Sequence, residues 1–176
     1  MVISHKYRYL FIETPQTGCS AIRKELILNY DGESILSKHS SYYEFLKIAS
    51  KDERKYFVFL GVRNPLDTIV SKYVKLKNNH RDRYTKRLKF NFSRQLLFDI
   101  RDYFIYKKVK KENFSFEDYI NQNYLYLFDN ISTLYKSKLN GVVKFENLNE
   151  DFKKILKKLK IEPIRDLPIY NNTKNK

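Results

Sequence analysis

The strongest constraint on the fold is a junction near the start of the chain, where an apolar run gives way to an amphipathic helix. Tyr9 to Ile12 reads as a buried strand, and the apolar spacing from Ala21 to Tyr30 predicts a helix that Asp31-Gly32 ends. A helix that begins after a short polar turn presents unpaired backbone amides and its positive dipole end at one point. We therefore expect the turn, Thr14 to Gly18, to bind a phosphate or sulfate. The alternative is an ordinary connection in which Pro, Thr and Gly serve only the backbone conformation.

Length and composition restrict the class of protein. The chain has 176 residues, 42% of them hydrophobic, which is enough to bury a core, and we expect residues 1–176 to form a single domain. No apolar run approaches the roughly 18 to 20 residues of a membrane span, and no signal peptide is apparent, so we expect a cytoplasmic protein. The single cysteine, Cys19, excludes an internal disulfide and a cysteine metal cluster, and we expect no metal.

The formal net charge of +15 is concentrated in one stretch. From Lys72 to Lys111 there are 14 Lys and Arg residues against Asp82, Asp99 and Asp102, a net charge of +11. This excess predicts an anionic partner, although a general bias toward Lys, Asn, Ile and Tyr would also produce it. A nucleic acid is a less favoured partner, because the aromatic residues near this stretch follow the spacing of a helix core.

A second junction follows the apolar run Tyr56 to Val62, which has the character of an interior parallel strand. After Arg63, the residues Asn64 to Asp67 supply a helix N-cap, a proline at the first helical position and an acid in the first turn. We expect Ser71 to lie about two turns into this helix, away from the centre of its apolar stripe. That stripe is predicted to contain Leu66, Ile69, Val70, Tyr73 and Val74.

Strands and helices are predicted to alternate along the chain, which favours an α/β, three-layer, P-loop-like fold with a mostly parallel central sheet flanked by helices. Both junctions would then lie at carboxyl ends of strands. The other predicted elements include a strand over 34–37, a helix over 41–49 opened by a Ser41/Glu44 capping box, and a loop or irregular helix extension over 78–91. A helix is predicted over 94–108, with Leu96, Leu97, Ile100, Tyr103 and Phe104 on one face, and a short helix from Ser115 through Ile120. Farther along the chain, helical spacing occurs at Leu125, Phe128, Ile131 and Tyr135, a strand is predicted over 142–145, and Asn149 is predicted to cap a helix with Phe152, Ile155, Leu156 and Leu159 on its apolar face.

The first junction is not a Walker A loop, because it has one glycine and no lysine before the hydroxyl residue. A magnesium-dependent kinase is therefore disfavoured. With Arg63 and Ser71 as a second anion site, the two junctions suit a nucleotide that carries phosphate groups on both ends of its ribose.

The two junctions together resemble the sulfotransferases. Thr14-Pro-Gln-Thr-Gly-Cys-Ser20 is similar to the loop that binds the 5′-phosphosulfate, and Val62-Arg-Asn-Pro-Leu-Asp67, with Ser71 eight residues after Arg63, is similar to the 3′-phosphate motif. Three further segments follow in the family's order, and the set covers nearly the whole chain, with the carbohydrate sulfotransferases as the most similar branch. These segments are Lys38-His39-Ser40, Phe114-Ser-Phe-Glu-Asp118 and Lys144-Phe-Glu-Asn-Leu148.

The resemblance implies a reaction and a set of site residues. The donor would be 3′-phosphoadenosine 5′-phosphosulfate (PAPS), the product nucleotide adenosine 3′,5′-bisphosphate, and the acceptor a hydroxyl of a carbohydrate or similar anionic molecule, without a metal. His39 would be the general base, since histidine titrates near neutrality, and Lys38 would neutralise developing charge. On a strand these two neighbours would point to opposite faces. Glu146 is expected to orient a loop. The residues implied to bind the donor are Pro15, Gln16, Thr17, Gly18, Cys19, Ser20, Arg63 and Ser71.

The sequence departs from the family at Gln16, where the loop lysine that stabilises the leaving phosphosulfate oxygen is expected. An amide donates a hydrogen bond but carries no charge, and positioned charge at a developing anion is typically a large catalytic contribution. Three hypotheses remain open at this point: another cation, such as Lys38 or Arg23, replaces the lysine; the enzyme is slow; or the protein binds the nucleotide without turnover.

Overall fold

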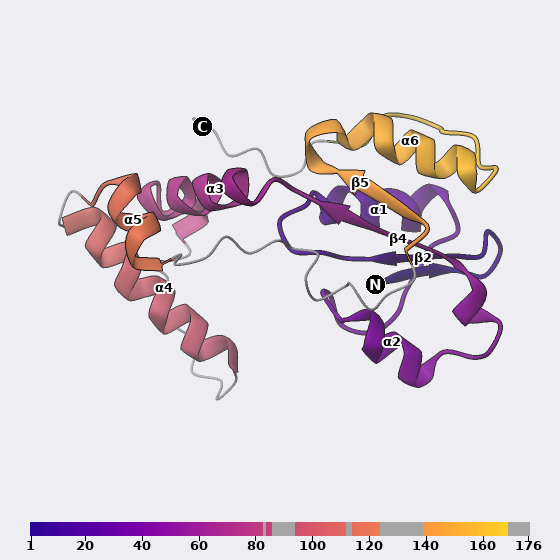
Figure 1. Ribbon diagram of the computed structural model, residues 1–176, viewed down its shortest axis with the longest axis horizontal. Helices are drawn as coiled ribbons and strands as arrows, with labels where there is room; N and C mark the ends of the chain where they lie inside the picture. Colours follow the sequence, from indigo (N-terminus) through magenta and orange to yellow (C-terminus); the bar gives the residue numbers. More distant parts are fainter. Residues whose placement is uncertain (83, 86–93, 112–113, 124–138, 169–176) are drawn as a thin grey trace. The chain divides into compact units, whose positions relative to one another are not determined.

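A mixed five-stranded sheet organises the first of two units into which the structure divides the chain (Figure 1). The computed structural model describes residues 1–82, 84–85, 94–111, 114–123 and 139–168. The first unit comprises Met1–Asn64 and Phe128–Asn172, and the second comprises Pro65–Leu127 with Thr173–Lys176. The sequence predicts one domain over residues 1–176, whereas the structure divides the chain into two units, with two apolar clusters in the first and a third in the second.

The sheet has the strand order β3-β1-β2-β4-β5. Its strands are β1 (Val2–Ser4), β2 (Tyr9–Ile12), β3 (Glu33–Ser34), β4 (Phe57–Val62) and β5 (Gly141–Lys144). The central strands β2, β4 and β5 run parallel, whereas β1 is antiparallel to both β2 and β3, so the sheet is only partly parallel rather than mostly so. The connection between Ser4 and Tyr9 is too short for the crossover that parallel strands need. The alternation of strands and helices is confirmed, but β1 was not predicted and β3 lies earlier than the predicted strand over 34–37.

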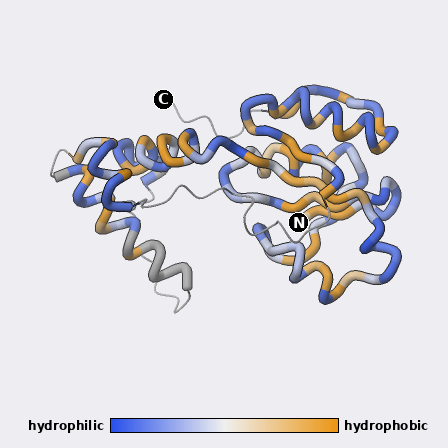
Figure 2. Tube along the Cα trace, viewed as in Figure 1, coloured by the Kyte–Doolittle hydropathy of each residue, from blue (hydrophilic) through white to orange (hydrophobic). Residues whose placement is uncertain are grey.

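Helices cover both faces of the sheet, so the first unit has three layers (Figure 1). Successive strand residues point to opposite faces, so Tyr9 and Phe11 pack with α1 (Cys19–Asn29) and α6 (Leu148–Lys158), while Leu10 and Ile12 pack with α2 (Tyr42–Ile48). Figure 2 shows the strands as mostly hydrophobic, with mixed hydropathy along the covering helices.

Local signals set several helix ends of the first unit. The predicted capping box of α2 is present, and the Ser41 amide that donates to Glu44 is the main cause that lowers the pKa of this carboxyl. Helix α1 starts two residues before the predicted position and ends at Asn29, one residue before the predicted end, with the Gly32 amide donating to the Leu26 carbonyl at 2.9 Å. A short 3₁₀ turn, η1 (Glu53–Lys55), precedes β4.

The predicted cap of the last helix was wrong by two residues. Asn147 occupies the N-cap of α6, and Asn149 lies in the first turn, where its Oδ1 accepts from the Leu167 amide at 2.8 Å. The tail is held further by Arg165, whose guanidinium donates to both oxygens of the buried Glu25 carboxylate. Asn149 therefore does not cap the helix but binds the segment that follows α6.

The second unit is helical in its described residues. It contains α3 (Pro65–Lys77), the 3₁₀ turn η2 (His80–Asp82), α4 (Arg94–Lys111) and α5 (Phe116–Asn123). The Tyr73 hydroxyl donates to the Phe114 carbonyl at 2.7 Å, and Ser115 and Asp118 cap α5 as predicted. The shared apolar cluster includes Ile69, Leu76, Val109, Phe114 and Tyr119, with Ile105 and Tyr106 against it.

Two predicted helix faces in this unit need correction. On α3, Ser71 is buried while Leu66 is 50% exposed, so the buried stripe lies to one side of the predicted one. On α4, Phe104 is 60% exposed, and the neighbouring positions face the cluster instead. The helical spacing predicted at Leu125, Phe128, Ile131 and Tyr135, and the side chains of Leu96 and Leu97, lie outside the described residues.

None of the helices in the described ranges is long and apolar enough to cross a membrane.

Replacing Ser41 with Ala should destabilise the first unit by about 1 kcal/mol, because α2 loses the hydroxyl that accepts from its N3 amide. Urea unfolding followed by far-UV circular dichroism measures this loss. The exposed Ser37, in the turn before α2, provides the control, and Ser37→Ala should leave the midpoint nearly unchanged. Equal losses in the two variants would show that the capping box does not stabilise the helix.

Candidate functional site

The carboxyl ends of β2 and β4 meet at one edge of the sheet. These strands are adjacent and parallel, with Ile12 opposite Leu60, so the chain leaves both in the same direction. The turn that follows β2 and the arginine that follows β4 therefore come together within the first unit. In α/β sheets this edge is where ligands bind.

The turn between β2 and α1 takes an unusual backbone path. Gln16 has a φ of 64° and Gly18 a φ of 75°, and Gly18 is the N-cap of α1 without a side-chain capping bond. A Cβ on Gly18 would lie 3.0 Å from Cδ2 of Leu148, so both its conformation and its surroundings favour glycine. The helix terminus is thus capped by neither a Ser nor an Asp side chain and keeps its amides for another acceptor.

A glycine in β4 allows the turn to lie directly on the sheet. The Thr17 hydroxyl donates to the Thr14 carbonyl at 2.8 Å, and this hydroxyl would be 2.6 Å from a Cβ built on Gly61. Any larger residue at position 61 would push the turn away from the strand. Sequence reasoning missed this role, although an isolated glycine inside a strand often marks a close backbone approach.

Several polar groups of the turn have no internal partner. In the part of the chain that the structure describes, the amides of Thr17, Gly18, Cys19 and Ser20 have no backbone acceptor. The buried Oε1 of Gln16 has no hydrogen-bond partner there either. Because the two ends of a carboxamide are nearly isosteric, a half turn of this group would present its Nε2 donors instead. The arrangement suits an anion that accepts several hydrogen bonds.

The side chains of the turn contribute unequally. Thr17 is fully buried, and Cys19 is 4% exposed, with burial raising the pKa of its thiol. These two predicted site residues can therefore offer only their amides to a ligand. Pro15 is exposed and has no amide hydrogen, so Gln16 and Ser20 are the turn residues whose side chains can reach a ligand.

Arg63 lies beside this turn and is only 8% exposed. Its Nη1 donates to the Gln16 carbonyl at 3.1 Å, and the centre of its guanidinium lies 4.0 Å from the centroid of the Phe145 ring. The arginine thus joins the end of β4 to the backbone of the first junction. A guanidinium carries five N–H donors in a planar fork and binds phosphate through two of them.

The segment after β5 holds both junctions in place. Phe145 and Glu146 belong to the 3₁₀ turn η3 (Phe145–Asn147), and Oε1 of Glu146 accepts from the Asn64 amide at 2.8 Å. Leu148 packs against Gly18 on the other side. Glu146 therefore orients the loop after β4, as expected, whereas the contact between Phe145 and Arg63 was not foreseen.

Lys38 and His39 lie in a turn rather than on a strand, which corrects the expectation that they point to opposite faces. Strand β3 ends at Ser34, and His39 has a φ of 69°. Lys38 Nζ donates to the Ser20 hydroxyl at 3.0 Å, and His39 Nδ1 lies 2.7 Å from the Glu13 carbonyl. Both side chains consequently reach the junction between β2 and α1.

Lys38 and Arg23 differ in the charges around them. Arg23 forms an ion pair with the buried carboxylate of Glu13, which also pairs with the Met1 ammonium group, and it donates to Ser34. Lys38 has no carboxylate within 4.0 Å among the described residues. Of the two cations considered as replacements for a loop lysine, Lys38 is therefore the one without a carboxylate partner among the described residues, and it lies beside the amides of α1.

The contact of His39 determines which ring nitrogen can act as a base. A carbonyl oxygen only accepts, so Nδ1 must carry the proton that it donates to Glu13. In the neutral ring the lone pair then lies on Nε2, and the side chain is exposed. This geometry orients His39 as a proton acceptor.

Ser71 belongs to the second unit and is not among the residues that the first unit brings together. It is 1% exposed on α3, and its hydroxyl has no hydrogen-bond partner among the described residues. Thr68, one turn earlier, has a buried hydroxyl in the same situation. These unsatisfied hydroxyls are consistent with an additional polar partner for this helix.

Among the described residues, no group of three or more His, Cys, Asp or Glu side chains could hold a metal ion.

No protein-family model, curated protein or solved structure matches the chain.

The His39 contact predicts its tautomer. In nitrogen NMR of the neutral side chain, Nδ1 should be protonated and Nε2 unprotonated, because the Glu13 carbonyl accepts from Nδ1. The His39→Ala variant assigns the signal to this residue. Observation of the proton mainly on Nε2 would contradict the geometry and remove the basis for a directed lone pair.

Proposed function

We propose that this protein is a sulfotransferase that moves a sulfuryl group from PAPS to a hydroxyl of a carbohydrate or similar acceptor. The observation that carries the proposal is the meeting of three features at one junction. The amides of Thr17 to Ser20, the ammonium group of Lys38 and the imidazole of His39 all lie at the junction between β2 and α1. An anion cradle, a cation and a directed base are the groups that this reaction requires.

The turn suits the phosphosulfate end of the donor. Its unpaired amides can donate to the oxygens, and its left-handed residues, with Gly61 beneath Thr17, let the backbone come close to a ligand. The Ser20 hydroxyl and the Gln16 carboxamide add side-chain donors. Arg63 would hold the 3′-phosphate from the end of β4.

In the proposed reaction, His39 Nε2 accepts the proton of the acceptor hydroxyl while the Glu13 carbonyl keeps the ring oriented. The donor supplies a sulfuryl group whose bond to a phosphate oxygen breaks as the acceptor oxygen bonds to sulfur. Lys38 and the amides at the start of α1 stabilise the negative charge that develops on that phosphate oxygen. The proton therefore passes to His39, the sulfuryl group passes to the acceptor oxygen, and the negative charge on the leaving phosphate oxygen is stabilised by Lys38 and the amides.

Lys38 supports the view that the missing loop lysine is compensated. Its Nζ lies at the Ser20 side chain, within the same turn that carries Gln16, although it comes from a different segment of the chain. A positive charge delivered from residue 38 can act where residue 16 supplies only an amide. The alternative, nucleotide binding without turnover, is favoured by the uncharged Gln16 alone.

Donor recognition can be tested by calorimetry with adenosine 3′,5′-bisphosphate and AMP. The bisphosphate should bind more tightly, and Arg63→Ala should weaken it by about 10- to 150-fold, the equivalent of roughly 1.5 to 3 kcal/mol for a charge-assisted bond. Arg8→Ala is the control, because Arg8 pairs with Asp52 on an exposed surface. Equal affinity of the unmodified protein for both nucleotides would rule out a 3′-phosphate site and with it the sulfotransferase proposal.

Catalysis can be tested by following sulfuryl transfer to a panel of glycans. His39→Ala should lower turnover by on the order of 10² to 10⁴ with bisphosphate affinity nearly unchanged, because a general base acts in the transition state. His5→Ala is the matched control, since His5 contacts Tyr56 instead. Lys38→Met should also slow turnover, and adding Gln16→Lys to it should restore much of the rate.

The same assays separate the two functions. Tight bisphosphate binding without transfer, in both the unmodified protein and Gln16→Lys, would replace the enzyme with a nucleotide-binding protein. A rate that survives Lys38→Met would show that a different cation stabilises the leaving oxygen.

A further inference from the structure

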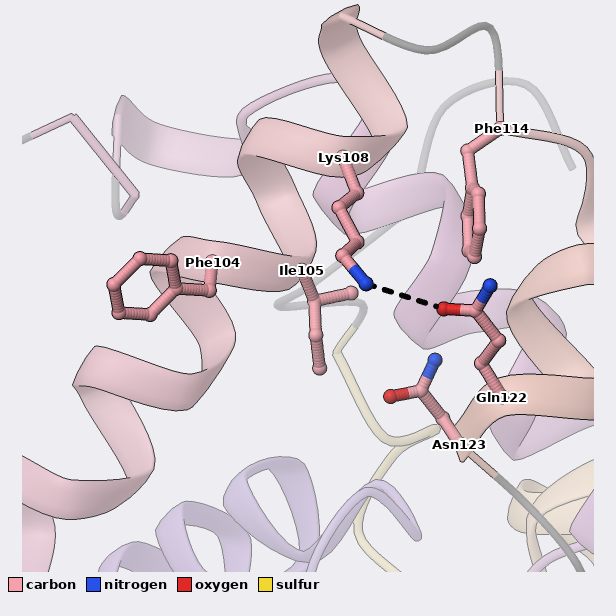
Figure 3. Close-up of a pocket in the computed structure, with 6 residues that line it drawn as sticks. All are labelled: Phe104, Ile105, Lys108, Phe114, Gln122 and Asn123. Carbon is pink, nitrogen blue, oxygen red and sulfur yellow. Dashed lines mark hydrogen bonds between the residues drawn. The ribbon is translucent and has the colours of Figure 1, made fainter.

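The second unit contains a pocket that none of the proposed site residues line. It has a volume of about 330 Å³ and lies between α4 and α5 (Figure 3). Its lining residues are Phe104, Ile105, Lys108, Phe114, Gln122 and Asn123. Ligand sites commonly range from about 300 to 1,000 Å³, so this volume suits a small molecule with a single ring.

One part of the lining is apolar. Ile105 is partly buried and Phe114 is 7% exposed, so both offer fixed surfaces that belong to the core of this unit. Phe104 is 60% exposed, and it lies one helical turn before Lys108 on α4. A ring could therefore pack against Ile105 and Phe114, while the Phe104 ring points away from the other lining side chains (Figure 3).

The other part of the lining carries one cation and two carboxamides. Lys108 Nζ approaches Gln122 Oε1 at 3.4 Å, a long contact that Figure 3 shows as the single bond drawn across the pocket. An ammonium group has three donors, and Lys108 has no carboxylate partner within the described residues. Its charge is therefore available to an anion in the pocket.

The carboxamides add donors and an acceptor beside this charge. Gln122 accepts from Lys108 through its oxygen and keeps its Nε2 donors. Asn123 donates from Nδ2 to the Tyr119 carbonyl at 2.9 Å, which orients the amide and leaves Oδ1 as an acceptor. A ligand that fits this set has an anionic group for Lys108 and Gln122, and a hydroxyl that donates to Asn123.

We propose that the pocket between α4 and α5 binds a ring compound that carries one anionic group and at least one hydroxyl, as sugar acids and hydroxylated aromatic acids do. Lys108 pairs with the anionic group, Asn123 accepts from the hydroxyl, and the ring lies against Ile105 and Phe114. The proposal shares no residue with the junction of the first unit and does not depend on nucleotide binding or sulfuryl transfer.

Nuclear magnetic resonance titration of the full chain tests this site, with glucuronate and 4-hydroxybenzoate as probes and with glucose and 4-hydroxybenzyl alcohol as uncharged counterparts. An acid should shift the methyl signal of Ile105 and the side-chain amide signals of Gln122 and Asn123. Its affinity should exceed that of the matching neutral compound by about tenfold or more, since a charge-assisted bond contributes roughly 1.5 kcal/mol or more. Glucuronate binding alone would assign the site to sugar acids, and hydroxybenzoate binding alone to aromatic acids.

Two lysine variants test whether Lys108 binds the anionic group. Lys108→Gln should lower the affinity for the acid by about tenfold or more, whereas Lys107→Gln, whose ammonium group lies over Tyr103, should leave it nearly unchanged. Both side chains are exposed, so neither change should prevent folding. Absence of shifts at Ile105, Gln122 and Asn123, equal binding of charged and neutral probes, or equal losses in the two variants would overturn the proposal. Bisphosphate binding in the same samples reports on the first unit separately.

Discussion

The parallel pairing of β2 with β4 is the constraint on which the candidate site depends. Because the two strands run in the same direction, the turn before α1 and Arg63 leave the sheet at one edge, and a side chain from one junction can bond to the backbone of the other. The close approach of Thr17 to Gly61 sets the distance between the turn and the sheet. The segment from Phe145 to Leu148 contacts the turn and Arg63 from the other side. The geometry of the site is therefore a property of the sheet as much as of the turn.

Features encoded by neighbouring residues could be predicted from the sequence. The capping boxes of α2 and α5 follow from residues three positions apart, and β4 follows from an uninterrupted apolar run between two charged segments. Because such signals are local, they place the two junctions correctly. The turn before α1 and Arg63 can for this reason be identified from the sequence alone.

Features that depend on distant partners could not be predicted in this way. Strand β1 has three residues, too few for a periodic pattern, and is defined by its pairing with β2 and β3. The turn that carries Lys38 and His39 reads equally well as a strand end, and its true course depends on contacts with Ser20 and Glu13. Phe104 fits the spacing of a core residue, but the helices that pack against α4 select another face.

Main-chain carbonyls accept three hydrogen bonds from side chains at the first junction. Thr17 donates to Thr14, Arg63 donates to Gln16, and His39 donates to Glu13. A main-chain carbonyl is present whatever side chain its residue carries, so these bonds place no requirement on the identity of the accepting residue. Mutation at position 16 can change the charge of the turn while its backbone remains anchored by Arg63. The shape of such a junction can therefore persist through sequence divergence that removes the motif by which it would be recognised.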